Sequence, residues 1–203
     1  IKLPPKTRRS VYLNDYLTNV AYGLSLTATD GFVAERAMYY SLGGLSDVSN
    51  CLSVPSARKF WYFAEGFTAA GFDTYFTLAN PTAYKATVTL TFLLDNGTSK
   101  SKSVTVNPFG RQTVLADQLL PSASFGTKIV SNYPIVAERA MYFTIGSING
   151  ASTTVGSQKL RYRWYFANGK ASNEFDTWLL VLNPQEQAAT ATVTFFPENG
   201  SSY

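Results

Sequence analysis

Histidine is absent from this 203-residue sequence, cysteine occurs once, and charged residues make up only 15% of the chain. The lone Cys51 cannot form an internal disulfide, and metal sites built on histidine or cysteine are excluded. We expect Cys51 to be a passive residue in a loop or in the core. Without histidine, a nucleophilic triad of the usual kind cannot be assembled either. The sequence therefore predicts no metal, no cofactor and no catalytic residue.

A long apolar run is also absent. No stretch reaches the roughly 18 apolar residues that a membrane-spanning helix needs. No signal-peptide pattern begins at Ile1, although a mature secreted protein would already have lost that segment. The net charge is +4, but the lysines and arginines form only small clusters at residues 6–9 and 161–163. We interpret these clusters as solvated basic surface, and we expect neither a membrane span nor a nucleic-acid partner.

Hydrophobic residues, at 45%, and aromatic residues, at 15%, are plentiful, and apolar side chains alternate with polar ones. In Ala86–Phe92 the apolar side chains share one face and three threonines share the other, which is typical of a strand with one solvated face. Thr190–Phe195 keeps the alternation. Both segments lead to an Asn-Gly turn, at residues 95–97 and 198–200, and Asn-Gly supplies the two positive φ angles of a tight hairpin.

Further strands are predicted at the spacing of about 8–12 residues that β-sandwiches show. The predicted strands are Phe60–Glu65, Thr74–Ala79, Ala86–Leu94, Lys100–Val106, Gln112–Ala116, Thr127–Ser131 and Ile135–Phe143. Asn132-Tyr133-Pro134 is predicted to be a turn, and short helical turns are expected at Asn14–Leu17 and Asp117–Leu120. Seven antiparallel strands in about 100 residues indicate an all-β fold of tandem immunoglobulin-like β-sandwiches.

The chain repeats itself at a constant offset of 103 residues. Val33–Tyr39 returns as Val136–Tyr142, Trp61–Ala64 returns as Trp164–Ala167, and 33 of the first 100 positions are identical to their counterparts. A period of this length indicates a domain-sized unit rather than one turn of a solenoid. The repeat-matched residues that we expect to be structural are Trp61, Tyr62, Phe63, Phe72, Asp73, Asn80, Pro81, Glu138, Arg139, Met141, Trp164, Asp176, Glu35 and Arg36.

The phase of the repeat predicts where the units lie. If a unit begins at Phe60, residues 60–158 form a complete β-sandwich, residues 1–59 the C-terminal half of one unit, and residues 159–203 the N-terminal half of another. The two halves are complementary, so a neighbouring chain can complete each of them, and such head-to-tail contacts propagate as a fibre. Two alternatives stay open: an excerpt of a longer covalent array, or two self-closed domains, Ile1–Lys100 and Val104–Tyr203.

A set of motifs supports a family resemblance. These motifs are Trp61–Gly66, Phe72–Tyr75, Asn80-Pro81, Ala86–Thr89 and Pro134–Tyr142. In this combination, over essentially the whole chain, the sequence resembles a secreted, tandemly repeated β-sandwich domain of prokaryotic surface proteins. The resemblance implies that the Trp-Tyr motif opens a unit, and it implies an extracellular, non-enzymatic, structural or adhesive role. The second copy departs from the pattern at Asn168, where the first has Glu65.

The repeated charged residues raise the question of catalysis. Adjacent residues in a strand face opposite sides, so we expect Glu138 and Arg139 to find separate partners, across strands or on a turn. A hydrolase that pairs the carboxylates of Asp73 and Glu138 is a distant alternative. Structural roles for these residues are the prediction.

The aromatic residues around the Trp-Tyr motif admit two interpretations: core and inter-domain packing, or an exposed platform on which sugars stack. These residues are Trp61, Tyr62, Phe63, Phe72, Tyr75 and Phe76. Asn96 and Asn199 head acceptor patterns for N-glycosylation on expected surface turns. The sequence thus predicts a structural subunit of an extracellular filament or surface appendage whose partner is itself. A carbohydrate-binding or adhesive repeat that recognises surface glycans is the alternative.

Overall fold

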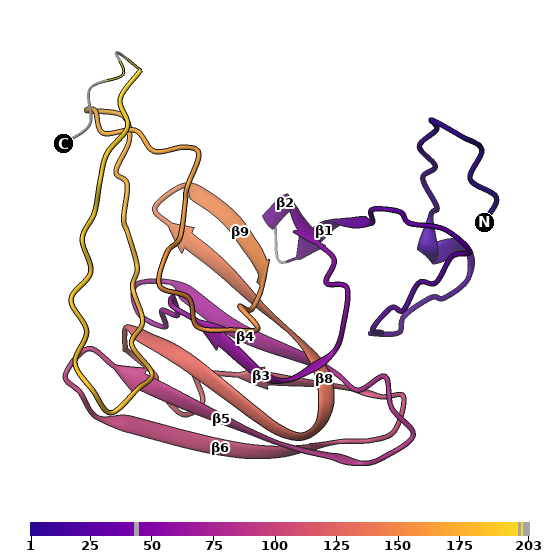
Figure 1. The fold of residues 1–203 in the computed structure, drawn as a ribbon, viewed down its shortest axis with the longest axis horizontal. Coiled ribbons are helices and arrows are strands. Elements are labelled where there is room, and N and C mark those ends of the chain that lie inside the picture. Colours follow the sequence, from indigo (N-terminus) through magenta and orange to yellow (C-terminus); the bar gives the residue numbers. More distant parts are fainter. Residues whose placement is uncertain (43–44, 199, 201–203) are drawn as a thin grey trace.

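The structure, a computed structural model, describes residues 1–42, 45–198 and 200 (Figure 1). Within them the chain is nearly all β, with antiparallel strands, one short 3₁₀ helix at Leu13–Asp15 and no α-helix. None of these residues belongs to a helix long and apolar enough to cross a membrane. The all-β class predicted from the alternating pattern is therefore confirmed.

Seven strands form one curled antiparallel sheet, and two more form a separate hairpin. The strands are β1 Glu35–Leu42, β2 Leu45–Leu52, β3 Arg58–Phe63, β4 Phe72–Ala79, β5 Ala86–Leu94, β6 Ser99–Val106, β7 Arg111–Leu115, β8 Phe125–Ile145 and β9 Ile148–Val155. The larger sheet consists of β3 to β9, and β1 pairs with β2. All strands of the larger sheet thus lie between residues 58 and 155.

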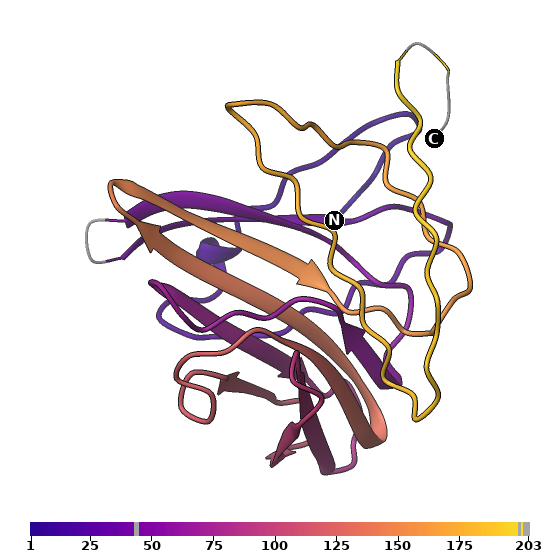
Figure 2. The ribbon, with the colours of Figure 1, turned by 90° about the vertical axis from the view of Figure 1, so that its left-hand side faces the viewer.

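The long strand β8 belongs to both halves of the larger sheet (Figures 1 and 2). Its first part, Phe125–Ser131, pairs with β3 and β5, and β6 extends the sheet beyond β5. Its second part, Val136–Ile145, pairs with β4 and β9, and β7 extends the sheet beyond β4. Because one strand serves both halves, the sheet curls over and encloses a single core.

The core is built by alternation along the strands. β5 buries every second residue over most of its length, and β4 does the same. Phe76 from β4 contacts Phe63 from β3 and Phe92 from β5, with ring centroids 5.3 and 5.9 Å apart. Side chains from both halves of the sheet therefore meet in one cluster. Apart from Cys51, the buried hydrophobic residues of the described chain lie within residues 61–141.

The first five predicted strands appear as β3 to β7 with bounds shifted by at most two residues. The last two, Thr127–Ser131 and Ile135–Phe143, are parts of the single strand β8, so the turn predicted between them at Asn132-Tyr133-Pro134 is wrong. Strand β8 runs straight through these positions. Proline lacks the N–H that a ladder needs, yet Pro134 lies where β8 changes partners. Ser131 pairs with Val88 of β5, and Val136 pairs with Ala79 of β4. A residue at that crossing point has no ladder hydrogen bond to lose.

The hairpin predicted at residues 95–97 joins β5 to β6, with a different turn geometry. Of the turn residues 95–97, only Gly97 has a positive φ, 79°. The amide of Gly97 donates to the carbonyl of Leu94 at 3.0 Å, and the amide of Leu94 donates to the carbonyl of Thr98 at 2.9 Å. This is a three-residue loop closed by a left-handed glycine, rather than the two-residue turn that the Asn-Gly pair predicts.

The β1–β2 hairpin has the same register as the β8–β9 hairpin. Glu35 lies opposite Leu52 in the first, and Glu138 lies opposite Val155 in the second, 103 residues later. The remaining pairs follow in the same register to the end of each hairpin. The two hairpins pack against each other, with β2 next to β9 (Figure 2).

The segments on either side of these strands form almost no regular structure. Residues 1–34 contain only the 3₁₀ helix, and residues 159–198 contain only an isolated bridge between Ser172 and Phe175. The strand predicted at Thr190–Phe195 is wrong, because in the described chain no strand runs beside it to accept and donate ladder hydrogen bonds. In Figure 1 this C-terminal segment folds back on itself as a long open loop.

Candidate functional site

An open cleft of about 420 Å³ lies on the outer face of the sheet formed by β7, β4 and the second part of β8. In β4 every second side chain from Thr74 to Leu78 is buried, so Asp73, Tyr75 and Thr77 face outward. We call this the tyrosine cleft. Its lining residues are Tyr40, Asp73, Tyr75, Thr77, Arg111, Thr113, Ala140 and Tyr142.

Three tyrosines from three strands form the wall of the tyrosine cleft. The ring of Tyr142 meets that of Tyr40 at 5.3 Å and 86°, and that of Tyr75 at 5.7 Å and 81°. Edge-to-face contacts of this kind are favourable and orient the rings. Desolvation, followed by the carboxylate of Asp47, raises the pKa of Tyr40; desolvation, followed by Asp73, raises the pKa of Tyr75. Both hydroxyls are therefore neutral hydrogen-bonding groups near pH 7.

The tyrosine cleft also contains charged groups of both signs. Asp73 lies beside Asp117, whose pKa is raised mainly by desolvation although its carboxylate accepts a hydrogen bond from the Thr74 amide at 3.0 Å. Arg111 is half-buried, and its guanidinium makes no hydrogen bond or ion pair with the described residues. Desolvation lowers the pKa of Arg111, and the carboxylate of Glu138 opposes that shift. A half-buried cation is thus available to a ligand.

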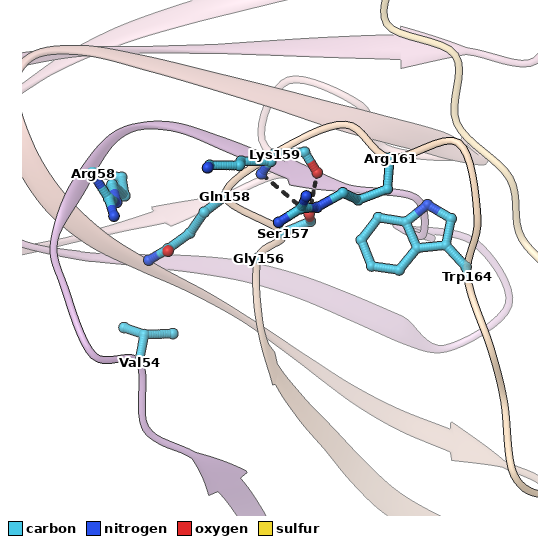
Figure 3. A pocket seen from close by; sticks show the side chains of 8 residues that line it. All are labelled: Val54, Arg58, Gly156, Ser157, Gln158, Lys159, Arg161 and Trp164. Carbon is cyan, nitrogen blue, oxygen red and sulfur yellow. Dashed lines mark hydrogen bonds between the residues drawn. The ribbon is translucent and has the colours of Figure 1, made fainter. Parts of the chain in front are cut away.

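A second cleft, of about 430 Å³, lies where the chain enters β3 and leaves β9 (Figure 3). Its lining residues are Val54, Arg58, Gly156, Ser157, Gln158, Lys159, Arg161 and Trp164. The Ser157 hydroxyl donates to the Lys159 carbonyl at 2.7 Å, and the Gln158 amide donates to the Ser56 carbonyl at 2.7 Å. We call this the basic cleft, since three of its side chains are cations. Trp164, which forms one wall, is 58% exposed.

The predicted aromatic residues separate into buried and half-buried groups. Trp61, Phe63 and Phe76 are buried, whereas Tyr62, Phe72 and Tyr75 are half-buried. The indole N–H of Trp61 donates to the carbonyls of Arg58 and Ile135, both at 3.1 Å. Buried rings cannot stack on a sugar, so a platform built on Trp61 is excluded, and Tyr75 alone of this set lines the tyrosine cleft. Met141 is also buried.

The adjacent residues Glu138 and Arg139 point to opposite sides of the sheet, as expected. The Glu138 carboxylate pairs with Arg36 of β1 at 2.8 Å. Arg139 is 5% exposed, pairs with the Glu65 carboxylate at 2.8 Å and donates to the Glu65 carbonyl at 2.7 Å. The expectation of separate partners is confirmed. Glu35, next to Arg36, is exposed.

Asn80 is a buried polar residue with a complete set of partners. Its Nδ2 donates to the carbonyl oxygens of Tyr84, Val106 and Asn107, at 2.7, 3.2 and 3.1 Å. Its Oδ1 accepts from the amide and the hydroxyl of Thr82, at 3.0 and 2.7 Å. Asn80 thus ties the end of β4 to the end of β6. Pro81, which follows it, is exposed.

The carboxylates of Asp73 and Glu138 do not form the pair that a hydrolase would need. Asp73 lies opposite Tyr142 of β8, and Glu138 lies opposite Thr77 of β4. The two positions are four residues apart along the strands, about 13 Å of backbone, and the Glu138 carboxylate is paired with Arg36 instead. Among the described residues, no group of three or more Asp, Glu, His or Cys side chains is placed to hold a metal ion.

The remaining predicted residues lie at the surface. Trp164 and Asp176 are exposed in the C-terminal segment. Asn96 is exposed on the turn between β5 and β6, where its side-chain oxygen accepts from the amide and hydroxyl of Thr98 at 3.0 and 2.6 Å. Asn199, the second acceptor position for glycosylation, lies outside the described residues.

Sequence reasoning missed two residues of the tyrosine cleft for which a signal was present. Arg111 is identical to Arg8, and Tyr142 to Tyr39, at the 103-residue offset. Tyr142 ends the repeated motif Val136–Tyr142, whereas Arg111 lies outside the repeated motifs and is matched to Arg8 as a single residue. Tyr40 gave no comparable signal, since it reaches the cleft only through the packing of the β1–β2 hairpin.

Comparisons with known proteins add a partial likeness in fold. No family model and no curated protein matches the sequence. A crystal structure of Thermotoga maritima 1070 is similar at 18% identity and a TM-score of 0.48, covering 51% of this chain and 96% of that one. The Anabaena sensory rhodopsin transducer is similar at 24% identity and a TM-score of 0.36, covering 42% of this chain and 97% of that one. Neither likeness bears on function.

Proposed function

We propose that this chain is a structural, non-enzymatic subunit that assembles head to tail, with each junction completed by two copies of the chain. The observation that carries the proposal is the pairing of β8 with β3, β4 and β5. At the 103-residue offset, the counterpart of β8 is residues 22–42, near one end of the chain. The counterparts of its three partner strands are residues 161–166, 175–182 and 189–197, near the other end.

The elements that form, and those that do not, fit this proposal. The hairpin β8–β9 needs no other strand, and its counterpart β1–β2 forms in the same register. The counterparts of β3, β4 and β5 contain no strand, nor do residues 22–34, which correspond to the first part of β8. A strand without a neighbour leaves its backbone groups without ladder partners. By the repeat, the strands that residues 22–34 lack as neighbours correspond to segments within residues 161–197, and the strand that those segments lack corresponds to residues 22–42.

The side chains of the C-terminal segment support a buried destination. Trp61, Phe63 and Leu78 are at most 3% exposed, whereas their counterparts Trp164, Phe166 and Val181 are 58%, 74% and 67% exposed. Covering one large apolar side chain is worth about 1.5–3 kcal/mol. Large apolar surface left exposed in this way is typical of an interaction site. We infer that a second copy covers it by supplying residues 22–52.

The contact so formed is heterologous, because the two surfaces that meet are different parts of the chain. Heterologous contacts that do not close into a ring grow into filaments. We infer that the unit formed by β3 to β9, and with it each completed unit, is an immunoglobulin-like β-sandwich, since seven antiparallel strands in about 100 residues match that architecture. The extracellular location of the filament rests on the resemblance of the motifs to repeats of prokaryotic surface proteins.

Matched variants of Trp61 and Trp164 test the proposal. Light scattering after gel filtration, with electron microscopy, is expected to show assemblies that grow with the concentration of the 203-residue chain. Trp164→Ala is expected to weaken association by about 2 kcal/mol or more, roughly thirtyfold. Circular dichroism is expected to stay unchanged, because the unit formed by β3 to β9, here called the central unit, stays folded. Trp61→Ala is expected to destabilise that unit by about 3–5 kcal/mol.

A monomer at every concentration would contradict the proposal, including one that buries Trp164. A monomer with a buried Trp164 would mean that the two flanking segments of one chain close on each other. Such closure is sterically feasible because the first and last strands of the central unit have neighbouring ends. The amide of Tyr62 donates to the carbonyl of Ser157 at 2.9 Å, so the two flanking segments of one chain start from neighbouring points. The fluorescence maximum of Trp164 in a monomer therefore separates closure within one chain from exchange between chains.

A further inference from the structure

We propose that the tyrosine cleft is a binding site for an oligosaccharide of pyranose rings. The inference goes beyond assembly, because the lining residues, except Tyr40, all belong to the central unit. The basic cleft is the weaker candidate. Its wall, Trp164, is the counterpart of the buried Trp61. If head-to-tail assembly holds, Trp164 becomes buried in the completed unit and no longer lines this cleft. The tyrosine cleft lies on the outer face of the sheet and does not depend on that residue.

The aromatic wall of the tyrosine cleft suits the apolar face of a sugar ring. Tyr142 is held between Tyr40 and Tyr75 by edge-to-face contacts with centroids 5.3 and 5.7 Å away. All three rings are half-buried, so each keeps part of its surface open to a ligand. Aromatic rings combine a large apolar surface with a fixed geometry, and tyrosine adds a hydroxyl at the edge. Rings already held in fixed orientations can stack on a pyranose without first being ordered by it.

The polar groups of the cleft suit sugar hydroxyls. Arg111 offers up to five N–H donors in a planar fork, none of them used by the described residues. Asp73 supplies carboxylate oxygens, which accept only. Thr77 and Thr113 lie directly opposite each other in the β4–β7 register, so their hydroxyls stand between these charged groups. Except for Tyr40 on β1, these groups sit on the paired strands β7, β4 and β8, which hold them more firmly than loops do.

The length of the cleft indicates more than one sugar ring. Asp73 begins the outward row of β4, and Arg111 lies opposite Ala79, six residues further along that strand. Six strand residues span about 20 Å. The volume, about 420 Å³, lies within the range of ligand pockets. An oligosaccharide can therefore lie along β4, stacked on the tyrosines and hydrogen-bonded at its two ends.

The residues that matter to this chemistry recur in the other copy of the repeat. Asp73, Arg111 and Tyr142 are identical to Asp176, Arg8 and Tyr39, and Tyr75 corresponds to the aromatic Trp178. Packing does not explain the recurrence of the charged pairs, since Asp73 is exposed and Arg111 has no ionic partner in the described chain. If head-to-tail assembly holds, a second cleft forms at each junction, with Arg8 and Tyr39 from one chain and Asp176 and Trp178 from the next.

Binding is tested on the dispersed Trp164→Ala chain, so that the result does not depend on assembly. Cellotetraose, maltotetraose and tetragalacturonate are titrated by calorimetry up to about 10 mM, a weak but measurable range. We expect saturable binding of at least one of them at one site per chain. Arg111→Gln and Tyr142→Ala are each expected to weaken it about tenfold or more, with unchanged circular dichroism. Arg8→Gln is the matched control and is expected to leave this site unchanged.

Two results overturn the proposal: no saturable binding of any of the three sugars, or binding that survives both Arg111→Gln and Tyr142→Ala. The wild-type chain then tests the junction cleft separately. In assembled protein we expect two sites per chain, one of them lost with Arg8→Gln. One site per chain in filaments overturns the junction cleft alone, and a failure to assemble overturns the proposed function without touching the first site.

Discussion

Arg36 and Glu138 form an ion pair of 2.8 Å between the two copies of one motif. Arg36 is the arginine of the first Glu-Arg-Ala-Met-Tyr sequence, and Glu138 is the glutamate of the second. The pair fastens the β1–β2 hairpin to β8, next to the contact between Tyr40 and Tyr142. The β1–β2 hairpin and its repeat counterpart β8–β9 thus pack on each other with equivalent residues displaced by one position, since both contacts join residues 102 apart rather than 103.

The first prediction concerns this pair. Both side chains are partly exposed, at 32% and 22%, so solvent screens the interaction. We expect Arg36→Gln to destabilise the packing of the hairpin by about 1 kcal/mol, without unfolding the central unit. Hydrogen exchange of the β1 and β2 amides is the measurement. Glu35→Gln, at the exposed neighbour, is the control, and equal effects of both substitutions would show that the ion pair does not hold the hairpin.

The second prediction compares Asn80 with its counterpart Asn183. Asn80 is 1% exposed and donates to three carbonyl groups, whereas Asn183 is exposed and donates only to the carbonyl of Gln187, at 2.7 Å. Leaving buried carbonyl groups without donors costs about 1–3 kcal/mol. We expect Asn80→Ala to lower the free energy of unfolding of the dispersed chain, measured by urea titration, by that amount, and Asn183→Ala to change it by less than about 0.5 kcal/mol.

In assembled chains the same two substitutions are expected to become more alike. If residues 175–182 pair with a second copy, Asn183 acquires the environment of Asn80, so Asn183→Ala should then weaken association. Gel filtration at several concentrations measures this. An Asn183→Ala chain that assembles as well as the wild type would count against burial of that segment.

Much of the fold was predictable because the alternating pattern and the turn residues are local signals. Ala86–Leu94 was placed with its observed bounds. The course of β8 was not predictable, since the meaning of Pro134 depends on which strands lie beside it. Thr190–Phe195 shows the opposite case: the pattern is that of a strand, but no neighbour is present to complete it. The tyrosine cleft needed the structure, because Tyr40 and Tyr142 meet only through hairpin packing.

The third prediction concerns Cys51, which is 7% exposed in β2. Desolvation, aided by the carboxylate of Glu138, raises the pKa of its thiol to about 11. Only the thiolate reacts with disulfide reagents, so at pH 8 we expect labelling about a hundredfold slower than for an ordinary thiol. The labelling rate should rise about tenfold per pH unit up to the raised pKa. Rapid labelling at pH 8 in the native protein would contradict this environment.

The same shift has a consequence for stability. The folded state keeps the Cys51 proton to higher pH than the unfolded chain, whose thiol has a pKa near 9. Between about pH 9 and pH 11 the unfolded state therefore binds fewer protons, and the free energy of unfolding falls as pH rises. Below pH 9 this contribution is fully present. Urea unfolding of wild type and Cys51→Ala across that window measures the difference, which is expected to vanish if the thiol does not titrate differently in the two states.

The last prediction concerns Arg139, whose guanidinium is buried against Glu65. Desolvation lowers the pKa of Arg139, and Glu65 opposes that shift, so the carboxylate keeps a buried charge in place. Removing it leaves the cation with only the Glu65 carbonyl as partner. We expect Glu65→Gln to cost about 2 kcal/mol of unfolding free energy, below the full cost of breaking a buried pair because Glu65 itself is 40% exposed. Glu174→Gln, at an exposed position, is the control and should change stability by less than about 0.5 kcal/mol.

The second copy of the repeat has Asn168 in place of this glutamate. If an amide can take over part of the pairing with Arg139, Glu65→Asn should lower the free energy of unfolding less than Glu65→Ala does. Equal losses for both substitutions would show that only the charge matters.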